Sequence, residues 1–239
     1  MIKRHVILSV IISAILFVSP MAFAVEFGPN SAKITNRYYP ATVGGWSYKL
    51  GFGASVGSTS YGNVVGVEEV SGAQIEAQTF NNVKCLKVNI ITTYLNDVDE
   101  FISFWMAQDT DGNLWVLKGY SHFEDETFML GTAIKSMFMP AVPTVGGPAG
   151  IIAIEDPDHT YCQVDAAGIS VNTNFGSYTG CIKSICLFNS VIDSVEYYCP
   201  DVGEVRTTED SSSNPQDVMD LKEFGTATVT RTVVIPLMD

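Results

Sequence analysis

The chain has 239 residues, 46% of them hydrophobic and 16% charged. Its 26 Asp and Glu outnumber its 13 Lys and Arg, which gives a formal net charge of −13. Such an acidic balance argues against binding to nucleic acid or to an anionic membrane surface, because both require a basic footprint. The length is enough to bury a sizeable core.

Residues 1–24 have the three parts of a secretory signal peptide. Two basic residues precede an apolar stretch from Val6 to Val18, and Ala22-Phe23-Ala24 is a small-residue cleavage site. The stretch is shorter than the roughly 20 residues that span a membrane, and no cysteine follows it for lipid attachment. We therefore expect residues 25–239 to form a single β-rich domain, periplasmic or secreted, that does not span the membrane.

The mature sequence has the pattern of strands separated by turn residues. The expected strands are 46–50, 64–70, 74–78, 83–94, 101–107, 114–120, 169–173, 181–188, 195–198 and 226–236. Asp109 to Asn113 is rich in turn residues and predicts a hairpin. At most one or two short helices are expected, one around Phe128 to Phe138, and a polar loop at about 204–217. Strands without interleaved helices predict a mainly β fold with an antiparallel sheet.

The five cysteines of the mature chain are Cys85, Cys162, Cys181, Cys186 and Cys199. Export permits disulfides, and an odd number leaves at least one thiol free or paired with another chain. Cys181 and Cys186 lie on one expected strand and point to opposite faces, so they are not expected to bond to each other. Cys186 and Cys199 flank a turn near residues 189–193, and we expect this pair to form a disulfide. No C-x-x-C is present, so a metal site is not expected.

The sequence offers little for catalysis. The mature chain has only two histidines, His122 and His159, and no serine in a G-x-S-x-G elbow. Its carboxylate pairs fall at strand ends or in loops, where they are typical of solvated surface. Asp109 to Asn113 departs from a calcium loop because its glycine is fourth rather than sixth. We predict no catalytic residue and no cofactor, and therefore not an enzyme.

Aromatic residues gather on or beside the expected strands. Large aromatics usually fill the core of a β-protein. On a strongly curved sheet the same side chains would line an apolar cavity. The candidates for such a binding site are Trp46, Tyr48, Phe104, Trp105, Trp115 and Tyr197.

Several motifs resemble a family of exported bacterial proteins without assigned activity. Tyr38-Tyr39-Pro40, followed by Gly44 and by Trp46-Ser47-Tyr48, is similar to the opening of that family. Further similar stretches follow in the same order: Asp109 to Trp115, Met139 to Gly146, Phe175 to Lys183 and Glu196 to Val205. The chain departs from the family pattern at Cys199, Asp201 and Glu204.

The resemblance implies a strongly curved antiparallel sheet, a half-barrel similar to that of outer-membrane lipoprotein carriers, whose concave face holds acyl chains. We therefore expect a non-enzymatic exported binding protein that holds an apolar ligand, such as a lipid, or a lipidated partner on its concave face. The alternative is an envelope or extracellular protein-interaction domain with a solid core. The two are distinguished by whether the concave side is hollow.

Overall fold

The computed structural model describes residues 25–41, 47–52, 58–75, 78–94, 97–121, 126–128, 137–150, 160–188, 191–209 and 217–225. These residues form strands, turns and irregular segments. No helix among them is long and apolar enough to cross a membrane. The predicted mainly β, antiparallel class is confirmed for this part of the chain.

Within the described residues, no helix lies between the strands. Their bounds are β1 (Ser47–Phe52), β2 (Ser58–Val70), β3 (Ala73–Ile75), β4 (Gln78–Phe80), β5 (Val83–Tyr94), β6 (Asp97–Gln108), β7 (Leu114–Ser121), β8 (Glu126–Phe128), β9 (Met137–Met139), β10 (Thr160–Asn172), β11 (Ser177–Phe188), β12 (Val191–Cys199), β13 (Gly203–Glu209) and β14 (Asp217–Gly225).

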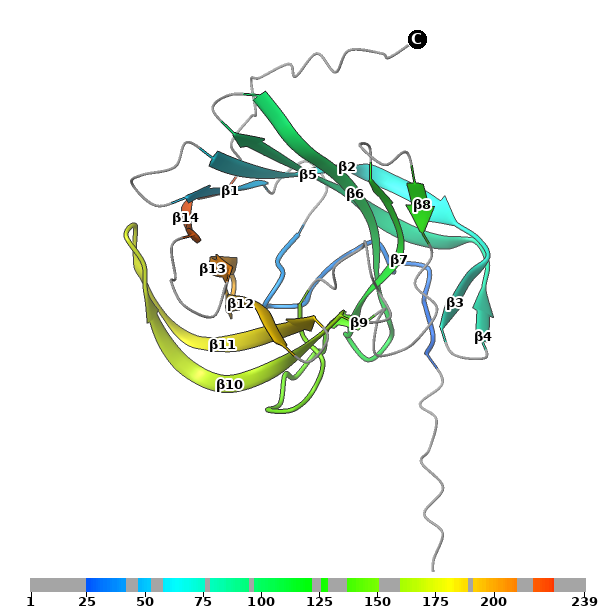
Figure 1. Cartoon of the computed structure of the whole chain (residues 1–239). Helices are drawn as coiled ribbons and strands as arrows, with labels where there is room; N and C mark the ends of the chain where they lie inside the picture. Colours follow the sequence, from blue (N-terminus) through cyan, green and yellow to red (C-terminus); the bar gives the residue numbers. More distant parts are fainter. Residues whose placement is uncertain are drawn as a thin grey trace, which may run out of the picture.

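One large sheet has the strand order β10-β11-β12-β13-β14-β1-β2-β5-β6-β7-β8, while β3 and β4 form a separate hairpin. Figure 1 shows this sheet curling, with β10 and β11 at the bottom and β5 and β6 at the top. Register shifts interrupt many of the strand pairs, including three between β10 and β11. Such irregularities bend a strand and increase its twist, which accounts for curvature in so long a sheet.

Residues 137–150 connect the two sides of the curl. β9 pairs with β7, and the Gly150 amide donates to the Phe138 carbonyl. Further along the same segment, the Val164 amide of β10 donates to the Gly147 carbonyl. Backbone hydrogen bonds therefore run from β7 through this segment to β10. They occupy donors and acceptors that a sheet edge would otherwise leave unpaired.

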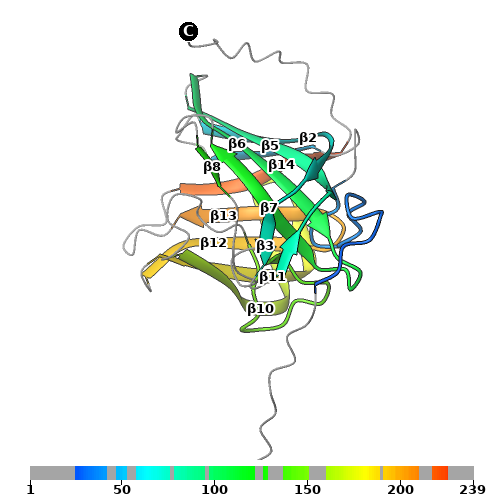
Figure 2. The ribbon, with the colours of Figure 1, turned by 90° about the vertical axis from the view of Figure 1, so that its right-hand side faces the viewer.

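An N-terminal strap, residues 25–41, crosses one end of the curled sheet, which we call the strap end (Figure 2, blue). Asn36 anchors it: its side-chain nitrogen donates to the carbonyls of Gly112, Met139 and Pro140 at 3.1–3.3 Å. On the opposite side, the Asp201 amide donates to the Arg37 carbonyl at 2.6 Å. The strap thus ties the β6–β7 turn to the β12–β13 turn.

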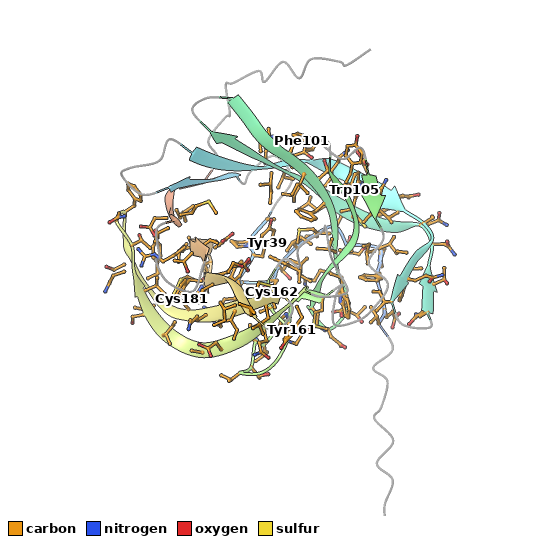
Figure 3. The ribbon with its side chains drawn as sticks, viewed as in Figure 1. Tyr39, Phe101, Trp105, Tyr161, Cys162 and Cys181 are labelled. Atoms are coloured by element: carbon orange, nitrogen blue, oxygen red, sulfur yellow. A yellow bond between two sulfur atoms is a disulfide. The ribbon has the colours of Figure 1, made fainter. Side chains whose placement is uncertain are left out.

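The strap also supplies core side chains. Tyr39 lies inside the curve of the sheet (Figure 3) and packs edge-on against Phe138, which packs edge-on against Tyr198. Tyr39 and Tyr198 are at most 3% exposed. This end of the interior is therefore filled by aromatic packing rather than hollow.

Both faces of β5, β6 and β7 are buried. We call the face toward Tyr39 the inner face; it carries Leu86, Phe104 and Leu114. The outer face of the same strands carries Trp105 and Trp115, beneath the β3–β4 hairpin. Alternating residues of a strand point to opposite faces, so adjacent apolar residues serve two separate clusters.

The expected disulfide between Cys186 and Cys199 is wrong. Cys162 bonds to Cys186, and Cys181 bonds to Cys199, while Cys85 is a buried free thiol. Cys162 and Cys186 are directly opposite on β10 and β11. β11 and β12 do pair antiparallel, but the register places other cysteines opposite each other. The expectation that Cys181 and Cys186 do not bond to each other is confirmed.

Two further predictions are corrected in part. The expected polar loop begins later, because Gly203–Glu209 forms β13, with Val205 and Thr207 buried. Of the expected helix around Phe128 to Phe138, residues 129–136 lie outside the described residues, and the described parts belong to β8 and β9. The expected strand 226–236 and the signal peptide also lie outside them.

Thiol counting tests the disulfide pattern. We expect no reactive thiol in the native mature protein, because Cys85 is fully buried and burial raises its pKa to about 12. Denaturation without reductant exposes one thiol. A titration with a thiol reagent, with and without denaturant, measures both numbers. More than one thiol after denaturation would contradict the two disulfides.

Replacing Asn36 tests the strap. We expect Asn36→Ala to lower the free energy of unfolding by about 2 kcal/mol, because buried carbonyl groups lose their donor. Chemical denaturation measures the change. Asn30→Ala is the matched control, since Asn30 is exposed on the same strap. Equal stability of the two variants would show that the amide does not hold the strap.

Candidate functional site

The structure separates the aromatic residues that the sequence suggested as a cavity lining. Phe104 is on the inner face, whereas Trp105 and Trp115 are in the outer cluster. Tyr197 is partly buried against the main core. Trp46 and the side chain of Tyr48 lie outside the described residues. The described members therefore do not form one site.

The outer-face tryptophans have structural hydrogen bonds. Trp105 donates to Glu68 at 2.6 Å, and the ammonium groups of Lys87 and Lys118 lie 4.6 and 4.3 Å from its ring centroid. The hydrogen bond from Trp105 is the main reason that the pKa of Glu68 is lowered, with a further contribution from Lys87. These contacts tie β2, β5, β6 and β7 together across the outer face.

The hairpin at Asp109 to Asn113 is confirmed, and its carboxylate is fully engaged. One oxygen of Asp109 accepts from the amides of Asp111 and Asn113. The other accepts from the Asn113 side chain and from the indole of Trp115 at 2.8 Å. Four N–H donors occupy the positions that a calcium ion would need, so the loop functions as a turn.

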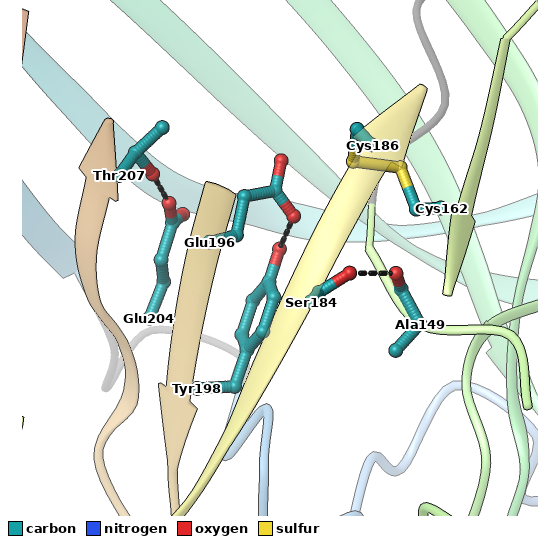
Figure 4. Close-up of a disulfide and its surroundings, with 8 residues drawn as sticks. All are labelled: Ala149, Cys162, Ser184, Cys186, Glu196, Tyr198, Glu204 and Thr207. Atoms are coloured by element: carbon teal, nitrogen blue, oxygen red, sulfur yellow. Dashed lines mark hydrogen bonds between the residues drawn. A yellow bond between two sulfur atoms is a disulfide. The ribbon is translucent and has the colours of Figure 1, made fainter. Parts of the chain in front are cut away.

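A polar group lies on the inner face across β11, β12 and β13 (Figure 4). Ser184 is opposite Glu196, and Tyr198 is opposite Glu204. Because Tyr198 packs on Phe138 inside the curve, its cross-strand and alternate neighbours share the inner face. We call Ser184, Glu196, Tyr198, Glu204 and Thr207 the interior polar group.

Each member of the interior polar group has a hydrogen bond. Tyr198 donates to Glu196 at 2.7 Å, Thr207 donates to Glu204, and Ser184 donates to the Ala149 carbonyl. The Ser184 hydroxyl is thus paired with a carbonyl rather than with a base that would activate it. Within the described residues, no set of side chains is suited to hold a metal ion.

Two carboxylates in this group affect each other. Burial raises the pKa of Glu204 well above its usual range, and the nearby charge of Glu196 adds to the effect. Burial, together with Glu204, also raises the pKa of Tyr39. Glu204 therefore binds a proton more readily than an exposed glutamate does.

The backbone of Gly150 closes over this group. A side chain at Gly150 would place its first carbon 2.6 Å from a Glu196 carboxylate oxygen, and the residue has a φ of +112°. Only glycine fits such a position without strain. Gly150 therefore covers the Glu196 carboxylate close to the Cys162–Cys186 disulfide.

The inner face becomes more exposed with distance from the strap. We call the opposite end of the sheet the distal end. It is the end at which β5 and β13 finish and at which β6, β12 and β14 begin. On β5, β6 and β14 the inner residue nearer the strap is buried and the next one is half-buried. The buried ones are Val88, Phe104 and Leu221, and the half-buried ones are Ile90, Ile102 and Met219.

The interior polar group is not predictable from the sequence. Glu196 and Tyr198 lie two residues apart on a predicted strand, so alternation places them on one face. No local signal shows that this face is the inner one, because Val195 and Tyr197 offer the other face an equally apolar pair. Glu204 was assigned to a polar loop.

No protein-family model matches the chain, and no curated protein does. A solved structure of a candidate lipoprotein from Parabacteroides distasonis is 14% identical and covers 79% of this chain and 98% of its own, with a TM-score of 0.45. A candidate exported protein from Bacteroides fragilis with a YmcC-like fold is 12% identical and covers 78% and 97%, with a TM-score of 0.39. Likeness at this level implies nothing about this chain's function.

The raised pKa of Glu204 predicts how stability depends on pH. A carboxyl group that binds its proton more tightly when folded favours folding below its unfolded pKa of about 4.5. That stability is lost as the pH rises through the folded pKa. We expect Glu204→Gln to raise the melting temperature at neutral pH and to flatten its decline above pH 4.5.

Melting curves across the pH range measure this effect. Glu69→Gln, at an exposed position on β2, is the control and should follow the parent protein. If Glu204→Gln also paralleled the parent at every pH, a raised pKa of Glu204 would not be the cause of the pH dependence.

Proposed function

We propose that this chain is a non-enzymatic exported binding protein that holds an apolar group on the inner face of its sheet at the distal end. The half-barrel architecture inferred from the family resemblance belongs to the same proposal. The strap would then close one end of the half-barrel, and the ligand would enter at the distal end.

The observation that carries the proposal is the exposure of Ile90, Ile102 and Met219. On β5, β6 and β14 these residues adjoin Val88, Phe104 and Leu221, which are buried on the same inner face. Ile90 and Ile102 are directly opposite each other on β5 and β6. Half-buried apolar side chains on a concave face gain free energy when a ligand removes them from water.

The packing at the strap end supports a site toward the distal end. Tyr39, Phe138 and Tyr198 fill the interior at the strap end, so we place the proposed site beyond them. The serine and the carboxylates of the interior polar group are hydrogen-bonded to protein groups. This supports binding rather than chemistry.

One observation favours the alternative, a protein-interaction domain. Tyr161, Leu187 and Ile192 are neighbours on β10, β11 and β12 on the face away from the Cys162–Cys186 disulfide. Tyr161 and Ile192 are 40% and 37% exposed. Such an apolar row on a convex face suits contact with another protein.

An uncharged, environment-sensitive dye such as Nile red tests the proposed site. We expect the mature protein to bind it, and Ile90→Thr combined with Ile102→Thr to weaken binding about tenfold, since each loses about 0.8 kcal/mol of apolar contact. Fluorescence titration measures the affinity. Native mass spectrometry and lipid extraction of protein from its own host would then identify the natural ligand.

Val142→Thr combined with Val145→Thr is the matched control, because both valines are exposed, at 77% and 66%, in the 137–150 segment. Circular dichroism confirms that each double variant folds. Equal loss in both double variants, or no dye binding by the parent, would remove the distal inner face as a site and favour the interaction-domain alternative.

A further inference from the structure

A surface pocket lies between the strap and the β6–β7 turn. Its volume is about 290 Å³, close to the lower limit of about 300 Å³ for small-molecule sites. Six strap residues between Gly28 and Thr35 line it, together with Gln108, Asp109 and Thr110. All of them belong to the described part of the chain. The pocket is therefore distinct from the distal inner face, to which none of these residues belongs.

Hydrogen bonds between the strap and β6 fix the walls of this pocket. The Gln108 amide donates to the Ser31 carbonyl at 2.7 Å. The Gln108 side-chain carbonyl accepts from the Thr35 amide at 2.7 Å. Beyond β6, the Thr110 amide donates to the Glu26 carbonyl at 2.9 Å. The pocket is thus formed before a ligand arrives, and binding does not require the strap to become ordered.

The one anionic side chain of the lining is already in use. Asp109 accepts from four N–H donors of the hairpin, which occupy the acceptor positions of both its oxygens. A ligand that carried a cationic group would therefore find no free acceptor on this carboxylate. The role of Asp109 in the pocket is to hold the turn in place.

Three other polar side chains of the lining are available. The ammonium of Lys33, the amide of Asn30 and the hydroxyl of Thr110 form no hydrogen bond or ion pair with described residues. They offer one positive group and two neutral groups that both donate and accept. A pocket with fixed walls and a few available polar groups is the usual form of a small-molecule site.

We propose that this pocket binds a small hydroxylated carboxylic acid of the size of a sugar acid, whose carboxylate contacts Lys33 and whose hydroxyl groups contact Asn30 and Thr110. The lining has a single available cation, which matches a singly charged carboxylate better than a phosphate that carries up to two charges. Hydroxyl groups suit side chains that both donate and accept. The small volume suits a ligand of about one sugar ring.

Nuclear magnetic resonance of the ¹⁵N-labelled mature protein tests the site, with glucuronate as the probe and glucose as its uncharged analogue. We expect glucuronate to shift the backbone amide signals of the strap residues that line the pocket and of Gln108, Asp109 and Thr110. It should bind at least tenfold more tightly than glucose, because a hydrogen bond to a charged group contributes more than a neutral one. The signals of Ile90 and Ile102 should not move.

Matched variants locate the charge. We expect Lys33→Gln to bind glucuronate about tenfold more weakly and to bind glucose as the parent does. Lys84→Gln removes the same charge at an exposed position outside the lining and should bind glucuronate almost as the parent does. Asn30→Ala should weaken the binding of both sugars without lowering the free energy of unfolding, because its amide contacts the ligand and not the protein.

Each contrary result has a definite meaning. Equal loss in the Lys33 and Lys84 variants would overturn the proposal, because net charge alone would then attract the anion. Equal binding of glucuronate and glucose, or the absence of shifts at the pocket, would overturn it as well. Dye binding at the distal inner face is measured separately, so failure of this proposal leaves the proposed function standing.

Discussion

The architecture depends on the amide group of Asn36. A long curled sheet has no intrinsic reason to keep its two sides at a set distance, and its open end would expose the inner apolar rows. Asn36 satisfies carbonyl groups from the β6–β7 turn and from the end of β9, while the neighbouring Arg37 carbonyl reaches the β12–β13 turn. The strap itself buries these backbone groups. It must therefore supply their hydrogen-bond donors, because unpaired buried carbonyl groups would destabilise the docked strap. Docking is therefore cooperative, and it brings Tyr39 into the interior.

Covalent and polar constraints stiffen the half of the sheet opposite β5 and β6. Two disulfides join three consecutive strands, β10, β11 and β12. The interior polar group lies on β11, β12 and β13, where its two glutamates face the interior in place of aliphatic side chains such as those of β5 and β6. A buried carboxylate destabilises the fold when ionised, so the cross-links offset a cost that grows as the pH rises through the raised pKa of Glu204. The half that contains β10 to β13 is therefore held by disulfides and polar contacts, and the half that contains β5 and β6 is held by apolar packing.

The two ends of the molecule have different physical character. The strap end is packed, hydrogen-bonded and mixed in charge, which are the properties of a structural closure. At the distal end, the inner face carries the half-buried apolar side chains of Ile90, Ile102 and Met219.

Local pattern was enough to predict much of the secondary structure. β5 has the predicted bounds of 83–94, and the Asp109 to Asn113 hairpin forms as its turn residues indicate. Strand alternation also showed that Trp105 and its neighbour Phe104 point to opposite faces, although it could not show which face is inner. That choice depends on the β3–β4 hairpin, which covers the side of Trp105, and on the strap, which covers the side of Phe104.

By itself the sequence determined the β class, the turns, the acidic balance and the odd thiol, because these depend on neighbours in the chain or on composition. Only the tertiary structure decided that Cys162 rather than Cys199 is the partner of Cys186, since disulfide partners are set by the register of paired strands. It likewise decided that the strap crosses the sheet and that Glu196 and Glu204 face inward. All three depend on contacts between residues far apart in the chain, which leave no local signal.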